Sequence, residues 1–230
     1  MLLQIDTLEN IAEELAMQEG PVEESVNLWT MAAYGGWIMV ILAVLLLWAV
    51  YLFIERMVVL HAAMRENKSF MDRIKDYIHE GKISSAVNLC HQTDTPSARM
   101  VEKGISRIGR PMQDVQVAIE NVGNLEVSKL EKGLVIMATI AAGAPMLGFL
   151  GTVLGMVQTF YNMAQNASGV IEMSALSEGM YQAMVTTIGG LIVGILAMFA
   201  YNFLVSRIDR VVRNLEGKTM EFMDLLNEPA

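Results

Sequence analysis

Residues 139–160 read TIAAGAPMLGFLGTVLGMVQTF, and residues 183–202 read AMVTTIGGLIVGILAMFAYN. Neither stretch contains an acidic or basic residue, and both are rich in Gly, Ala and Thr. They lie in longer uncharged runs, at 133–171 and 179–206, which exceed the roughly 20 residues that a helix needs to cross a bilayer. Because small side chains let membrane helices approach closely, these stretches predict two spans that pack against protein.

A third uncharged run, at 25–54, differs in composition. From Trp37 to Ile54 it is rich in Leu, Val and Ile and has almost no small or polar side chains. This pattern predicts a span that faces lipid. The chain as a whole is 53% hydrophobic and contains 19 Met, as expected for an integral membrane protein.

The basic residues predict how the spans are oriented. All 16 Lys and Arg lie in two blocks, at 56–132 and 207–218. Because basic residues stay on the cytoplasmic side, the ends near Arg56, Lys132 and Arg207 should be cytoplasmic. The predicted fold class is therefore an all-α membrane protein with three transmembrane helices, its N-terminus outside and its C-terminus inside.

These patterns divide the chain into predicted segments. They are an outer amphipathic helix and linker at 1–30, spans at 31–55, 133–162 and 178–206, a cytoplasmic helical domain at 56–132, an outer loop at 163–177, and a cytoplasmic C-terminal helix at 207–230. The outer helix is expected at 4–18, where apolar residues recur at helical spacing.

Proline positions predict helix lengths. Pro145 is the only interruption expected between 111 and 164, and it can kink a membrane helix without ending it. No proline occurs between 174 and 227. Helices of about 50 residues reach about 75 Å, so the two inner spans should extend into a cytoplasmic bundle. Gly81 and Thr95-Pro96 should break the shorter helices there.

The composition argues against several functional classes. The net charge is −9, and the acidic segment before the first span contains no base, so nucleic acid is not an expected partner. The single Cys90 excludes an intrachain disulfide, and with His91 it offers too few ligands for a metal. The spans show no metal-ligand cluster, phosphate-binding loop or nucleophile–base pair, so neither an enzyme nor a cofactor is expected.

Small and hydroxyl residues form stripes on the two inner spans. The glycines predicted to pack helix on helix are Gly148, Gly151, Gly155, Gly190 and Gly194. Thr152, Thr186 and Thr187 lie within these stripes and could line a narrow wet path, although packing alone would also explain them. A proton path normally needs a titratable group at membrane depth. Neither inner span has one, so a partner would have to supply the carboxylate.

The motifs GFLGTVLGMVQTF at 148–160, YQAMVTTIGGLIVGILAMFAYN at 181–202 and IER at 54–56 resemble the MotA/TolQ/ExbB proton-channel family, ExbB and TolQ most closely. The resemblance implies a homopentamer in the bacterial inner membrane. Its second and third spans would surround the single span of an ExbD- or TolR-like partner, whose membrane Asp carries the proton.

The resemblance also implies roles for individual residues. Thr152 and Thr187 correspond to the pore threonines that face the partner Asp, and Thr186 neighbours the path. Gln182 stands where many members have a Glu. An amide cannot shuttle a proton, and Glu178, one turn earlier, is the alternative.

Further residues are expected where the spans meet the cytoplasm. Glu55 and Arg56 belong to the cytoplasmic mouth. Arg207, Arg210 and Arg213 should anchor the third span to lipid headgroups, or form a basic ring that receives the tail of a partner.

The function that the resemblance implies is an ExbB-like stator, which couples the proton motive force through a TonB-like protein to outer-membrane transport. Two alternatives remain: a TolQ-like subunit of the Tol-Pal system, and a passive oligomeric membrane scaffold.

Overall fold

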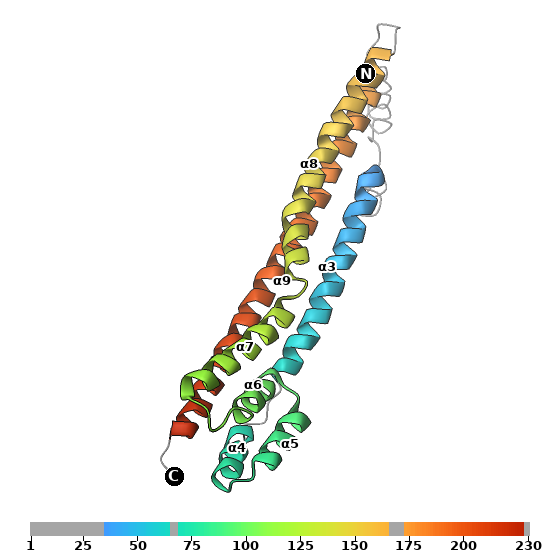
Figure 1. The fold of residues 1–230 in the computed structure, drawn as a ribbon. Coiled ribbons are helices and arrows are strands. Elements are labelled where there is room, and N and C mark those ends of the chain that lie inside the picture. Colours follow the sequence, from blue (N-terminus) through green and yellow to red (C-terminus); the bar gives the residue numbers. More distant parts are fainter. Residues whose placement is uncertain (1–34, 65–68, 166–172, 228–230) are drawn as a thin grey trace, which may run out of the picture.

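Regular structure is entirely helical in residues 35–64, 69–165 and 173–227, the parts that the computed structural model describes. The helices are α3 (Gly36–Ala63), α4 (Phe70–His79), α5 (Ile83–Thr93), α6 (Pro96–Ile105), α7 (Met112–Glu131), α8 (Leu134–Gln165) and α9 (Met173–Asn227). The predicted outer helix at 4–18 lies outside these residues, as does the centre of the outer loop. In Figure 1, α8 lies along one half of α9 and α7 beside the other half, while α3 flanks the membrane half and α4–α6 gather at the opposite end.

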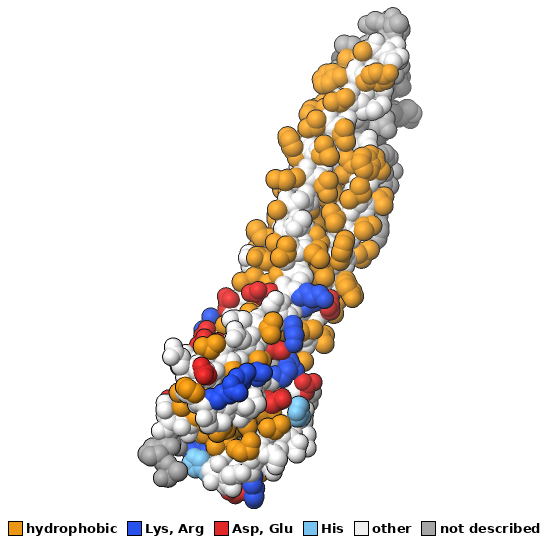
Figure 2. All heavy atoms as spheres, in the orientation of Figure 1, with side chains coloured by type: hydrophobic (Ala, Val, Ile, Leu, Met, Phe, Trp, Pro, Cys, Tyr) orange, Lys and Arg blue, Asp and Glu red, His pale blue; other side chains and the backbone are white. Residues whose placement is uncertain are grey.

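Within the described residues, three helices are long and apolar enough to cross a membrane, as the sequence predicts. Helix α3 has two faces. Leu42, Leu52 and Leu60 are buried against the rest of the chain. Trp37, Leu47 and other large side chains three or four positions apart remain exposed on the other face, in keeping with the predicted contact with lipid. Figure 2 shows this apolar surface over the spans and the charged side chains gathered at the other end.

Helix α9 runs without interruption for 55 residues, about 80 Å, as the absence of proline predicts. In its second half, Ile208, Val211, Leu215 and Phe222 are buried in the helical bundle at the charged end of the molecule. Other apolar side chains of α7 and α9 in this region are exposed, and they include Val117, Leu125 and Met220.

The helix expected to continue from 111 to 164 is broken, so the prediction that Pro145 alone would interrupt it is wrong. Helix α7 ends at Glu131, and α8 begins at Leu134. Between them Gly133 has a φ of +86°, a left-handed conformation that glycine adopts without steric cost. Pro145 lies inside α8 without ending it.

The short helices α4, α5 and α6 are separated where the sequence predicts. Gly81 has a φ of +67° after α4. Thr95 caps α6, because its Oγ1 accepts a hydrogen bond from the Ala98 N–H at 3.3 Å, and Pro96 occupies the first helical position, which needs no donor. Both predicted breaks are therefore confirmed.

Candidate functional site

The backbones of α8 and α9 approach closely where two glycines face each other. A Cβ atom on Gly190 would lie 2.8 Å from the Gly148 Cα and 2.7 Å from the Ala144 carbonyl oxygen. A Cβ on Gly148 would meet the Gly190 Cα at 3.0 Å. Any larger residue at either position would force the two backbones apart.

The other stripe glycines also lie at this interface. Gly151 accommodates the side chain of Thr186, and Gly155 faces Ala183. Gly194 lies against Pro145 and the Ala141 carbonyl oxygen. Proline has no N–H, so that carbonyl lacks its usual helical donor, and the glycine lets α9 cover it closely. Within one chain, the stripes therefore join α8 to α9.

Thr187 forms a hydrogen bond across the α8–α9 contact, to a carbonyl one turn before Thr152. The Thr187 Oγ1 donates a hydrogen bond across the interface to the Gly148 oxygen at 3.3 Å. In a regular α-helix this same oxygen accepts the N–H of the residue four positions later, which is Thr152. The Thr152 hydroxyl itself donates to the Phe149 oxygen at 2.6 Å. We call the contact between these two helices the α8–α9 seam. The Thr152 and Thr187 side chains are half-buried, so their hydroxyls lie near the surface of this seam.

Thr186 occupies a different environment. Its side chain is 2% exposed, and its Oγ1 donates to the Ala183 oxygen of its own helix at 2.8 Å. Thr159, which is also buried, donates to the Gly155 oxygen and abuts Gly179. These two hydroxyls are satisfied inside the seam, whereas Thr152 and Thr187 lie at its edge.

Gln182 does not join the two seam threonines. Its side chain is exposed and lies against the start of α3, where a Cβ on Gly36 would meet the amide nitrogen at 2.7 Å. The structure therefore separates Gln182 from Thr187, although the two are only five residues apart. The side chain of Glu178 lies outside the described part of the structure.

The site contains no group that titrates near neutral pH. Residues 134–165 and 179–206 contain no Asp, Glu, His, Lys or Arg. A hydroxyl can donate a hydrogen bond to a carboxylate and accept one from a carboxylic acid. The seam can thus contact both protonation states of an incoming acid without changing its own charge.

Outside the seam, the described residues offer neither a metal-binding cluster nor a reactive cysteine. Among the described residues, no cluster of three His, Cys, Asp or Glu could hold a metal ion. Cys90 is buried, and burial raises the pKa of its thiol to about 12. The thiol is therefore protonated at neutral pH and is not a nucleophile.

Arg56 has protein partners rather than an exposed position at the membrane surface. The residue is 8% exposed. Its guanidinium donates to the Lys129 carbonyl in the last turn of α7 at 3.2 Å and pairs with Glu55 at 3.0 Å. A Cβ on Gly133 would lie 3.6 Å from its Nε. Arg56 thus links α3 to the break between α7 and α8.

The three arginines after the third span are not equivalent. Arg207 is half-buried, and its guanidinium lies 5.2 Å from the centre of the Phe203 ring. Arg210 and Arg213 are exposed.

Two parts of this arrangement were not predicted from the sequence. The carbonyl of Ala144 lies against Gly190, but alanine in a membrane helix carries no distinguishing signal. Gly133 was predictable, because a glycine directly after Lys132 is a common signal for the end of a helix.

Comparison with known proteins gives a consistent result. A sequence model of the MotA/TolQ/ExbB proton channel family matches residues 92–217. A putative biopolymer transport protein ExbB homolog from Methanothermobacter thermautotrophicus is 32% identical over 62% of this chain and 50% of its own length. ExbB of Neisseria meningitidis serogroup A is 25% identical over 74% of the chain and 80% of its own length. TolQ of Haemophilus influenzae is 25% identical over 80% and 83%. The chain thus spans about half the length of the Methanothermobacter relative.

Proposed function

This chain belongs to the MotA/TolQ/ExbB proton channel family, and from that premise we propose that it is an ExbB-like stator subunit of a proton-driven motor in the bacterial inner membrane. Five copies would surround an ExbD-like single-span protein. Proton flow would move that protein relative to the ring and so drive a TonB-like protein that serves outer-membrane transport. The N-terminus would lie outside and the C-terminus inside, as the basic residues predict.

The observation that supports this proposal best is the pair of hydroxyls, of Thr152 and Thr187, at the edge of an otherwise uncharged seam. The partner would supply the membrane Asp. When that Asp is ionised, the threonine hydroxyls would donate hydrogen bonds to its carboxylate. When it is protonated, their oxygens would accept a hydrogen bond from its O–H group. Alternation between these two contacts is the proposed coupling step.

The proposal predicts the outcome of removing each hydroxyl without changing side-chain volume. Thr187→Val and Thr152→Val should each assemble normally with the partner but lose most proton-driven activity, because one carboxylate contact is lost in each. Thr139→Val is the matched control, since the exposed Thr139 donates only to the Val135 oxygen of its own helix.

The measurement is proton uptake into proteoliposomes that contain the chain and its single-span partner, with the partner's Asp→Asn variant as the inactive reference. Wild-type proton uptake in both seam variants would reject the pore assignment. A wild-type complex that conducts no more than its Asp→Asn reference would favour the passive scaffold.

A further inference from the structure

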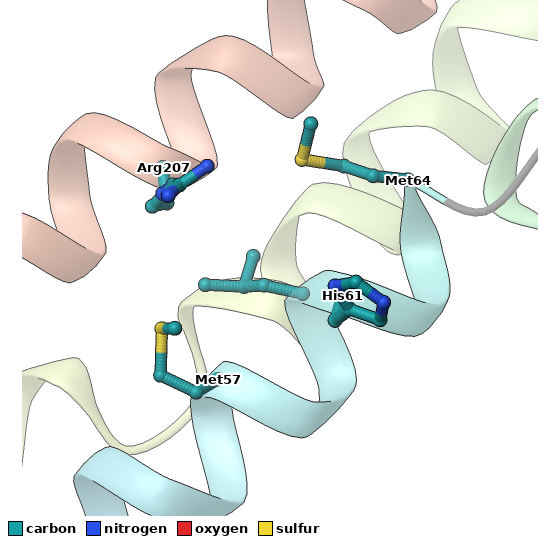
Figure 3. A pocket seen from close by; sticks show the side chains of 5 residues that line it. Met57, His61, Met64 and Arg207 are labelled. Carbon is teal, nitrogen blue, oxygen red and sulfur yellow. The ribbon is translucent and has the colours of Figure 1, made fainter.

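A pocket of about 370 Å³ lies between α3 and α9, away from the threonine seam. Met57, Leu60 and His61 line it from α3, Met64 lines it from the position directly after α3, and Arg207 lines it from α9. Figure 3 shows the methionines and His61 along one side of α3, with Arg207 on the helix opposite. The lining therefore combines an apolar wall with two nitrogen-bearing side chains and includes no carboxylate.

The pocket lies where the membrane spans meet the charged part of the molecule. On α9, Arg207 is the first charged residue after the uncharged run that ends at Ser206. On α3, Glu55 and Arg56 are the first charged residues, directly before Met57. This is the depth at which a bilayer changes from acyl chains to phosphate headgroups.

Arg207 lies over an aromatic ring of its own helix. Its guanidinium lies over Phe203 at 5.2 Å, and the Phe203 ring lies 6.1 Å from that of Phe53 on α3. A cation over an aromatic face is stabilised while its N–H groups remain available. No carboxylate in the described part of the chain pairs with Arg207, in contrast to Arg56 and Arg99.

We propose that this pocket binds the headgroup of an anionic phospholipid from the leaflet on the basic side of the membrane. The Arg207 guanidinium and an N–H of His61 would donate to the lipid phosphate, for which a guanidinium has the appropriate donor geometry. Met57, Leu60 and Met64 would contact the glycerol and the first methylenes of an acyl chain. The lipid would then bridge the helices α3 and α9.

Two features favour a lipid over a free phosphate ion. Three of the five lining side chains are apolar and would gain nothing from an inorganic ion. The pocket also lies beside the exposed apolar faces of α3 and α9, where Val58 and Phe203 are 65% and 42% exposed. An acyl chain can continue along these faces into the bilayer.

The test is native mass spectrometry of the delipidated full-length chain in detergent, titrated with dioleoylphosphatidylglycerol or dioleoylphosphatidylcholine. The anionic lipid should bind more tightly, and Arg207→Gln should weaken its binding by about five-fold, as expected for one basic group near an anionic headgroup. Arg213→Gln removes the same charge from an exposed position that does not line the pocket, so it should change binding less than about two-fold.

A second variant tests the pocket without removing charge. Met64 is 45% exposed, so the Met64→Trp variant should fold. Its indole should partly fill the pocket and weaken the binding of the anionic lipid as well. Equal effects of Arg207→Gln and Arg213→Gln would overturn the proposal in favour of diffuse attraction to the membrane. Full displacement of the lipid by inorganic phosphate would overturn it in favour of a site for the free ion.

Discussion

Glu126 is a carboxylate that α7 buries beside α6, and it is 4% exposed. It accepts hydrogen bonds from Arg99 at 2.6 Å and from Lys129 at 2.6 Å. Burial alone would raise the pKa of Glu126, but these two cations outweigh it and hold the pKa below its usual value. Arg99 also pairs with Asp94, which ends α5. This cluster therefore ties α5, α6 and α7 together.

The lowered pKa of Glu126 makes the stability of this domain depend on pH. A carboxyl group with a lower pKa in the folded state stabilises the fold above its unfolded pKa, and this stabilisation is lost as the pH falls through the folded value. The midpoint of thermal unfolding of the solubilised chain should therefore fall on acidification below about pH 4.5. Glu126→Gln should have a lower midpoint at neutral pH and a weaker acid dependence.

Glu120→Gln is the matched control for that variant, because Glu120 is exposed on the same helix and bonds only to Gln116. If Glu126→Gln and Glu120→Gln unfold alike at every pH, the buried cluster does not control the acid response.

Among the helices, the contact of α8 with α9 includes glycines that leave no room for a larger side chain. Gly190→Ala should lower the thermal midpoint of the chain, because its Cβ would collide with the backbone of Ala144 and Gly148, and overpacking of this kind costs about 1–3 kcal/mol. Gly143→Ala is the control on α8, since a Cβ at Gly143 would have no neighbouring atom within 4 Å. Equal midpoints for the two variants would show that the close approach at Gly190 is not required.

The helices also show which features the sequence can predict. The three spans were predictable because long uncharged runs have few alternative structures. The hydrogen bond from Thr187 to the Gly148 oxygen was not, because it depends on the rotation and register of two helices that are far apart in sequence. The position of Gln182 beside Gly36 depends likewise on how α3 packs. Glycine stripes indicate that helices touch, but not which atoms meet.

In the molecule as a whole, apolar side chains are exposed outside the predicted membrane region. Val117 and Leu125 on α7 are 50% and 63% exposed, and Met220 on α9 is 67% exposed. Lipid cannot cover these positions if the bundle is cytoplasmic. A neighbouring copy in a ring would bury them, in agreement with the proposed pentamer.

Leu125→Lys should therefore destabilise the oligomer while leaving the single chain folded. Native mass spectrometry of the wild-type chain, co-expressed with its single-span partner, should show five copies with the partner bound. The Leu125→Lys variant should shift toward smaller species. Gln116→Lys adds the same charge at an exposed polar position of α7 and should retain the wild-type mass. A wild-type chain that is a monomer or dimer and does not bind the partner would contradict the proposed pentamer.

Helix α9 continues unbroken from the membrane half into the helical bundle, whereas α8 is separated from α7 by a break. Helix α9 is a single rod, and a tilt of about 5° around its midpoint would displace its far end by about 3–4 Å, since half of its length is about 40 Å. A tilt of α8 would instead be absorbed by rotation at Lys132 and Gly133, which leaves α7 in place. Movement generated at the threonine seam would consequently reach the end of the helical bundle through only one of the two helices that form the seam.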